Sequence, residues 1–259
     1  MDMRKLALAV GFAAAWWAGA LGSAGAAEIH VMSSGGLTAA FKALIPVFER
    51  KSGHKVVLAL GPSMGTAEDA IPVRLARGEP ADMLLMVGYA LGSLVDKGVV
   101  KRDSRVDLAE SKIGLAVRAG APVPDIATLD AFKKSLLTAK SIAYSDSASG
   151  VYIEREMYRK IGLHDELAPK SRMIVSERVG NVVARGDAEM GFQQMSELIP
   201  VKGITLVGLI PAEAQSVTVF SAGIPVATRE PAAAAELMTF LRSPESAKTM
   251  QESGLEPMR

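Results

Sequence analysis

The sequence predicts an α/β protein built from two doubly wound lobes that are joined by a two-segment hinge. Short runs rich in Val, Ile and Leu alternate with segments of helical period, which favours parallel sheets covered by helices on both faces. The predicted strands are too many for one such sheet in 259 residues. Two long apolar runs, 112–118 and 217–227, are suited to carry the chain between lobes. We therefore predict one lobe from 28–115 and 219–259 and a second from 116–218.

Strands are predicted where short apolar runs are bounded by turn residues. In chain order they cover 28–32, 54–60, 82–87, 112–118, 141–144, 171–175, 189–193, 204–208 and 217–227. The first helix follows the first strand, because one helical face gathers Leu37, Phe41, Leu44, Ile45 and Phe48. Further helices are predicted at about 67–77, 89–97, 128–138, 150–161, 178–186 and 231–242, and Ser243 followed by Pro244 predicts the start of a last helix.

Residues 1–27 have the pattern of a secretory signal peptide. Arg4 and Lys5 precede an uncharged run that ends in Ser23-Ala24-Gly25-Ala26-Ala27, so cleavage is predicted after Ala26 or Ala27. The alternative is a retained transmembrane anchor, because the run is nearly long enough to span a bilayer. Its Ala and Gly content and its small terminal residues favour cleavage. Because no cysteine is present to carry a lipid, we expect a periplasmic protein without a lipid anchor.

The composition excludes several classes of function. The 29 basic and 28 acidic side chains nearly cancel without forming a basic run, so no nucleic-acid partner is expected. The absence of cysteine excludes disulfides, thiolate metal sites and a cysteine nucleophile, and three histidines argue against a histidine-rich metal site. We expect neither a metal nor a cofactor.

Three loops rich in small hydroxyl residues follow predicted strands and precede predicted helices. They are Ser33-Ser34-Gly35-Gly36, Gly61-Pro62-Ser63-Met64-Gly65-Thr66 and Ser145-Asp146-Ser147-Ala148-Ser149-Gly150. Ligands of open α/β sheets bind beyond the carboxyl ends of the strands, and hydroxyl and N–H groups at helix starts hold anions. Each loop alone is equally typical of an ordinary helix cap. Because the loops come from both predicted lobes, we predict a shared anion site.

One of these loops also fits the Gly-x-Ser-x-Gly pattern of a serine hydrolase, with Ser63 at the nucleophile position. The remaining features of such an enzyme do not follow. His164 is the only histidine after Ser63, and it lies well before the end of the chain. Few strands precede Ser63, and the loop at Gly35 and Gly36 lacks the histidine of the usual oxyanion motif. A serine hydrolase is therefore an alternative function.

A series of short motifs extends over nearly all of the chain after the signal peptide. They are Ile29-His30-Val31-Met32, Leu37-Thr38, the Phe41 to Phe48 helix with Lys51-Ser52-Gly53 after it, Arg77-Gly78-Glu79-Pro80-Ala81-Asp82, Ser149-Gly150-Val151-Tyr152, Arg185-Gly186-Asp187-Ala188-Glu189-Met190-Gly191 and Ser253-Gly254-Leu255. In their order and spacing, these motifs resemble the periplasmic molybdate-type solute-binding proteins of ABC importers, members of the type II periplasmic binding protein superfamily. The resemblance implies a hinged fold that closes on a small tetrahedral oxyanion and delivers it to an ABC permease.

The resemblance also implies roles for single residues. Ser63 falls on a ligand serine, Ser149 on a ligand backbone N–H and Ser176 near a further backbone donor. Two positions depart from the family: Gly36 stands where the family has a serine ligand, and Gln194 where it has a tyrosine. The segment after Ser63 is also longer. These departures predict a different or larger pocket, so a small organic anion is an alternative to a molybdate-like ligand.

The predicted ligand-binding set comprises Ser33, Ser34, Gly35, Gly36, Ser63, Met64, Ser147, Ser149, Ser176, Arg178 and Gln194. Arg178 is included because a guanidinium in the cleft pairs bidentately with a carboxylate. We expect no catalytic residue and no enzymatic activity. The predicted protein is a monomeric periplasmic receptor that captures a small anionic solute for an ABC permease. A periplasmic sensor that signals to a membrane partner is a further alternative.

Overall fold

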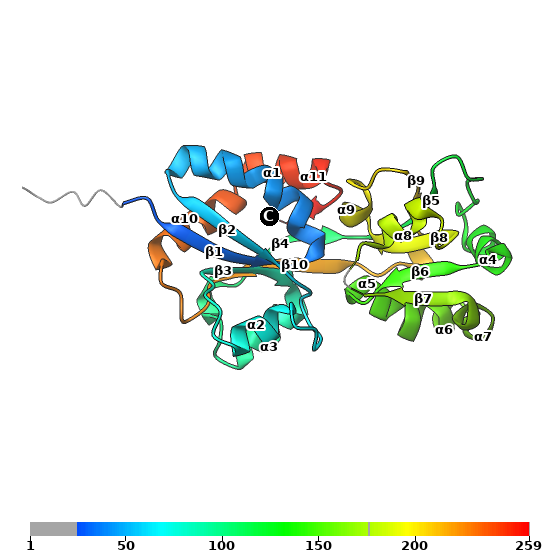
Figure 1. Cartoon of the computed structure of the whole chain (residues 1–259), viewed down its shortest axis with the longest axis horizontal. Coiled ribbons are helices and arrows are strands. Elements are labelled where there is room, and N and C mark those ends of the chain that lie inside the picture. Colours follow the sequence, from blue (N-terminus) through cyan, green and yellow to red (C-terminus); the bar gives the residue numbers. More distant parts are fainter. Residues whose placement is uncertain (1–24, 176, 259) are drawn as a thin grey trace, which may run out of the picture.

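The computed structural model describes residues 25–175 and 177–258, which form two α/β lobes side by side (Figure 1). The predicted signal peptide falls almost entirely outside these residues, as does Ser176. The first lobe contains a six-stranded sheet, and the second lobe contains a five-stranded sheet. Among the described residues, no helix combines the length and the apolar character needed to cross a membrane.

The sheet of the first lobe has the strand order β11-β4-β10-β3-β1-β2. Its strands are β1 (Glu28–Ser33), β2 (Lys55–Leu60), β3 (Met83–Val87), β4 (Val106–Ser111), β10 (Thr218–Gly223) and β11 (Glu256–Pro257). Its helices are α1 (Gly35–Ser52), α2 (Ile71–Ala76), α3 (Gly88–Asp96), α10 (Pro231–Leu241) and α11 (Pro244–Glu252). Successive residues of β1 serve opposite faces: Val31 packs with α1, α10 and α11, whereas Met32 packs with α2 and α3. Helices therefore cover both faces of this sheet (Figure 1).

The sheet of the second lobe has the order β7-β6-β8-β5-β9. Its strands are β5 (Ile113–Arg118), β6 (Ile142–Ser145), β7 (Ser171–Ile174), β8 (Met190–Gln194) and β9 (Ile204–Leu209). Its helices are α4 (Leu129–Thr138), α5 (Ala148–Tyr152), α6 (Tyr158–Lys160), α7 (His164–Leu167), α8 (Val179–Arg185) and α9 (Met195–Leu198). Phe132 of α4 packs edge to face on Phe192 of β8, with 6.0 Å between ring centroids. Ala143 on the opposite face packs against Val183 of α8, so this sheet is also covered on both sides.

The chain crosses between the lobes twice, and the crossing strands make both sheets mixed. β10 runs antiparallel to β3 and β4, and β5 runs antiparallel to β8 and β9. The predicted parallel pairing holds for β1 with β2 and β3 and for β6 with β7 and β8, and it is corrected at the crossings, where a strand that has just arrived from the other lobe runs against its neighbours. The first crossing lies at Lys112, so the predicted boundary between 115 and 116 falls inside β5. The second crossing ends where β10 begins at Thr218.

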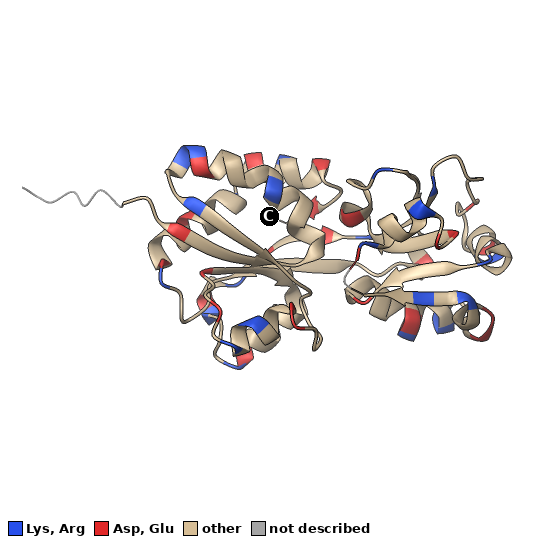
Figure 2. Ribbon diagram, in the orientation of Figure 1, with Lys and Arg blue, Asp and Glu red and all other residues tan. Residues whose placement is uncertain are grey.

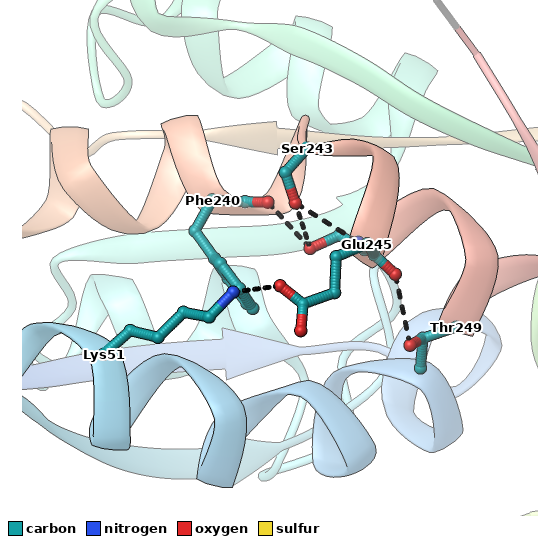
Figure 3. Close-up of polar contacts among 6 residues, drawn as sticks. Lys51, Phe240, Ser243, Glu245 and Thr249 are labelled. Atoms are coloured by element: carbon teal, nitrogen blue, oxygen red, sulfur yellow. Dashed lines mark hydrogen bonds and ion pairs between the residues drawn. The ribbon is translucent and has the colours of Figure 1, made fainter.

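Contacts with the end of α10 and with the end of α1 fix the start of α11 on the first lobe (Figure 3). The Ser243 hydroxyl accepts a hydrogen bond from the Ser246 N–H at 3.2 Å, and the Ser246 hydroxyl donates to the Phe240 carbonyl at 2.7 Å. The Lys51 ammonium pairs with the Glu245 carboxylate. These contacts confirm the predicted start of α11. Elsewhere, basic and acidic positions are interspersed over both lobes (Figure 2), as the near-neutral charge leads one to expect.

A buried carboxylate ties the start of β3 to the loop before α10. Asp82 Oδ2 accepts a hydrogen bond from the His30 N–H at 2.9 Å. Its Oδ1 accepts from the Thr228 hydroxyl at 2.7 Å and from the N–H groups of Arg229 and Glu230 at 2.9 and 3.2 Å. Burial raises the pKa of the Asp82 carboxyl, but these hydrogen bonds outweigh it and hold the pKa below its ordinary value.

Replacement of Asp82 by asparagine is expected to destabilise the protein by about 1–3 kcal/mol at neutral pH, because an amide group then faces buried donors. The lowered pKa makes the contribution of Asp82 fully present above the ordinary aspartate pKa, and it is lost as the pH falls through the lower folded value. Denaturant unfolding at neutral and acid pH measures this. Asp103→Asn, at an exposed position, is the control. Equal loss in both variants would contradict the role of Asp82.

Candidate functional site

The cleft between the lobes holds two adjoining cavities. The first, of about 370 Å³ including open solvent, is lined by Ser34, Gly35, Gly36, Pro62, Ser63, Met64, Val87, Ser147, Ala148, Gln194, Glu197 and Phe220. The second, of about 810 Å³ including open solvent, is lined by Ser33, Gly35, Thr38, Leu60, Gly61, Pro62, Asp69, Ser145, Asp146, Ser147, Glu177, Arg178, Gln193 and Glu197. All three predicted loops therefore contribute to one cleft.

Most of the predicted site residues come together at these cavities. The first cavity gathers Ser34, Gly35, Gly36, Ser63, Met64, Ser147 and Gln194, and the second adds Ser33 and Arg178. Ser149 lines neither cavity, because its buried hydroxyl turns toward Ser145 while Ser147 and Ala148 form the wall. Ser147 and Ala148 therefore form the part of the cleft wall that the sequence analysis assigned to Ser149.

The start of α1 supplies donors for an anion. The first N–H groups of a helix have no partner within the helix and carry partial positive charge, and here they belong to Gly35 and Gly36. The Ser34 hydroxyl is buried and has no hydrogen-bond partner among the described residues. This helix is 18 residues long, and its first turn faces both cavities.

The two departures from the family pattern have structural explanations. A Cβ on Gly36 would lie 2.8 Å from Cε1 of Phe220, so a serine fits here only if Phe220 moves. Gln194 Nε2 donates to the Thr218 hydroxyl at 2.9 Å. Gln194 Oε1 is buried without a partner among the described residues, at the wall of the first cavity. Beside Gly36, the first cavity therefore has the ring of Phe220 where the molybdate-type pattern has a serine hydroxyl. At position 194 it has an amide where that pattern has a tyrosine phenol.

Ser63 lacks the histidine partner that activates the nucleophile of a serine hydrolase. Its hydroxyl accepts a hydrogen bond from the Val87 N–H at 2.9 Å, which holds the loop to the end of β3. None of the chain's three histidines lines either cavity. His164 lies in α7, at the end of the second lobe away from the cleft (Figure 1), and contacts Asp165. The structure therefore gives the serine hydrolase alternative no histidine to act as general base on Ser63.

Arg178 brings a positive charge to the second cavity. It is half-buried and immediately precedes α8. The neighbouring Glu177 is engaged by Arg185 instead, through two hydrogen bonds of 2.9 Å each. Because Arg185 already neutralises the charge of Glu177, the positive charge of Arg178 remains available to a ligand in the second cavity.

Glu197 is a site residue that the sequence analysis missed. It lies in α9, its side chain is buried, and it lines both cavities. Gln193 Nε2 donates to Glu197 Oε2 at 2.6 Å, and the Val179 N–H donates to Gln193 Oε1 at 3.0 Å, which fixes the amide. From the first lobe, Gly35 approaches so closely that a Cβ there would lie 2.8 Å from the carboxyl carbon.

Burial raises the pKa of Glu197 to about 7. The charge of Arg178 and the hydrogen bond from Gln193 oppose this rise, whereas the charge of Asp146 adds to it. Burial also raises the pKa of Asp146, and the nearby Asp69 acts in the same direction. The cleft therefore combines donors for an anion with a carboxyl group that exchanges its proton near neutral pH.

A signal for Glu197 was present in the sequence. Gln193 and Gln194 place two polar side chains at the end of an apolar strand, and Glu197 follows them closely, in the position where loops and helix starts at strand ends bind ligands. The sequence analysis expected a strand at 189–193 but no helix after it. Among the described residues, no group of three or more His, Asp or Glu side chains is placed to hold a metal ion.

The family model of bacterial extracellular solute-binding proteins matches residues 29–256. The chain belongs to this family. The molybdate-binding protein ModA of Azotobacter vinelandii is 27% identical over 180 residues, 68% of each chain. The structure of the Azotobacter vinelandii periplasmic molybdate-binding protein matches with a TM-score of 0.74 at 22% identity, covering 89% of this chain and all of that one. The resemblance to molybdate-type solute-binding proteins and the two-lobed α/β fold are thereby confirmed.

A more similar relative corrects the prediction of a protein without enzymatic activity. Aconitate isomerase of a Pseudomonas species is 50% identical over 230 residues, 89% of this chain and 88% of that protein. A solute-binding protein fold is thus compatible with catalysis. The prediction failed because it looked for cysteine, histidine and metal chemistry, whereas a buried carboxyl such as Glu197 is itself able to move a proton.

The raised pKa of Glu197 predicts how the stability of the folded protein depends on pH. A carboxyl whose folded pKa exceeds its unfolded pKa costs stability as the pH rises from the ordinary glutamate value to about 7, and the full cost persists above. Relative to wild type, Glu197→Gln is therefore expected to gain thermal stability over this interval and then level off. Scans of Tm against pH measure the difference.

The control for this titration is Glu177→Gln. The hydrogen bonds and charge of Arg185 lower the pKa of Glu177, so its removal changes stability in the opposite sense, at acid pH. A Tm difference for Glu197→Gln that stays constant from acid to neutral pH would contradict the raised pKa.

Proposed function

We propose that this protein binds aconitate in the cleft between its lobes and interconverts the cis and trans isomers. The observation that carries the proposal is the 50% identity, over 89% of the chain, to an aconitate isomerase. At that identity the two proteins share a fold, and the cleft of this chain has the groups that such a reaction needs.

The donors of the cleft suit a small polycarboxylate. Aconitate carries three carboxylates, and these are matched by the start of α1 at Gly35 and Gly36, the hydroxyls of Ser34 and Ser147 and the guanidinium of Arg178. Aconitate is larger than a tetrahedral oxyanion. The extent of the cleft over two adjoining cavities, which share Gly35, Ser147 and Glu197, supports the larger ligand.

The molybdate-type relatives support a mode of binding, an anion held between two lobes, more strongly than they support molybdate as the ligand of this chain. We propose that the lobes close on aconitate by bending at the two crossings near Lys112 and before Thr218. Export to the periplasm fits the pattern of residues 1–27 and the periplasmic relative. Delivery of a ligand to an ABC permease, a signalling partner and a monomeric state stay predictions.

Incubation of the purified protein with cis-aconitate is expected to produce trans-aconitate, and both starting isomers should reach the same final ratio. Proton NMR distinguishes the isomers, because each has its own alkene proton signal. A thermal-shift series with aconitate and molybdate reports binding separately. Stabilisation by molybdate, with neither binding nor isomerisation of aconitate, would exclude the proposal.

The role of Arg178 is tested by Arg178→Gln. The loss of a charge-assisted hydrogen bond is expected to raise KM for aconitate about 10-fold or more, with a smaller change in kcat. Arg172→Gln is the matched control, because Arg172 is exposed on β7 of the same lobe and lines neither cavity. If both variants kept the wild-type KM, Arg178 would not contact the substrate.

A further inference from the structure

We infer that Glu197 is the catalytic residue that carries the proton between the two outer carbons of aconitate, an inference that rests on the proposed function. The carboxyl lies where the two cavities adjoin, because Glu197 lines both. Gly35 faces it from the other lobe and also lines both cavities. A ligand that fills the cleft therefore lies against this carboxyl.

The isomerisation is a proton transfer that balances without a cofactor. Aconitate has a methylene carbon and an alkene carbon on either side of a central carbon, and each of the three carries a carboxylate. A base takes a methylene proton, and the C–H electron pair forms a new double bond to the central carbon. The electron pair of the old double bond moves to the former alkene carbon, which takes a proton and becomes the methylene. The orientation of the outer carboxylates sets whether the new double bond is cis or trans.

One carboxyl is sufficient for both halves of this transfer. It accepts the proton as a carboxylate and returns it as a carboxylic acid, so it works best when both forms are populated at the working pH. The burial that raises the pKa of Glu197 to about 7 meets this condition. The first turn of α1, at Gly35, lies beside the same carboxyl and stabilises the negative charge that spreads over the substrate during the transfer.

The other ionisable groups of the cleft are placed less well. Asp69 and Asp146 line the second cavity but not the first. The Glu177 carboxylate already accepts two hydrogen bonds from the Arg185 guanidinium. Glu197 alone of these carboxyl groups lines the first cavity, together with the buried oxygens of Ser34 and Gln194, which have no hydrogen-bond partner in the described part of the chain.

A purely structural role does not account for a carboxyl at this position. Glu197 Oε2 accepts one hydrogen bond, from Gln193 Nε2 at 2.6 Å, and a glutamine at 197 would accept the same bond through its amide oxygen. Burial of an acid in an anion-binding cleft costs free energy that an amide avoids. Gln193 is in turn oriented by the Val179 N–H at 3.0 Å, so we assign it a positioning role toward Glu197.

The test compares Glu197→Gln and Glu197→Asp with wild type. We expect Glu197→Gln to lower kcat about 100-fold or more while a thermal shift with aconitate persists. The acid limb of the wild-type kcat/KM profile should have its midpoint at about 7. Glu197→Asp keeps a carboxyl but withdraws it, so it should retain a reduced kcat with a displaced acid limb. Glu166→Gln, at an exposed position in α7, should behave as wild type.

The outcomes separate the two proposals. Wild type that fails to isomerise aconitate would overturn the proposed function and this inference together. Active wild type with a folded Glu197→Gln variant of unchanged kcat would overturn this inference alone. If the glutamine variant does not fold, the aspartate variant decides, because wild-type kcat with an unmoved pH profile would also overturn the role of Glu197.

Discussion

The close approach of the Glu197 carboxyl to Gly35 sets the geometry of the cleft. It joins α9 of the second lobe to the start of α1 in the first, and only a glycine leaves room for it, since a Cβ would lie 2.8 Å from the carboxyl carbon. The contact places an acid beside the positive end of an 18-residue helix and removes it from solvent. Because both residues line both cavities, the shape of the site follows from this approach.

The burial of acidic side chains also determines the balance of charge in the cleft. A site for an anion tolerates acidic side chains only when their charge is paired or suppressed. Arg185 pairs with Glu177, and burial raises the pKa values of Asp146 and Glu197. The positive charge of Arg178 and the N–H groups of α1 are then free to dominate locally. This matters because a net charge of +1 provides almost no attraction from a distance.

The sequence predicted those parts of the site that depend on local pattern. Apolar periodicity located most strands and helices, and the ends of those strands located the loops at Ser34, Ser63 and Ser147. Glu197 escaped because its burial comes from a helix of the other lobe, which no local pattern encodes. β4 was missed for a related reason: its sequence Val-Asp-Leu-Ala-Glu-Ser is neither an apolar run nor a regular alternation, and it takes its place by pairing with β10 and β11. The direction of the crossing strands likewise depends on the arrangement of whole lobes.

The step from receptor to isomerase requires little new structure in this fold. A receptor needs donors that hold an anion as the lobes close, and the loops at strand ends already supply them. An isomerase needs in addition a group that takes a proton from one outer carbon and returns it to the other, two carbons away, while the carbanion is stabilised in place. An acid at position 197 meets the first need because burial brings its pKa to about 7, and the start of α1 at Gly35 meets the second.

The same closure that excludes water from a bound solute strengthens both effects, since charges interact more strongly when water is removed. Under the proposed function, catalysis in this cleft is an addition to binding by one well-placed carboxyl, and it needs neither cysteine nor a histidine at the cleft.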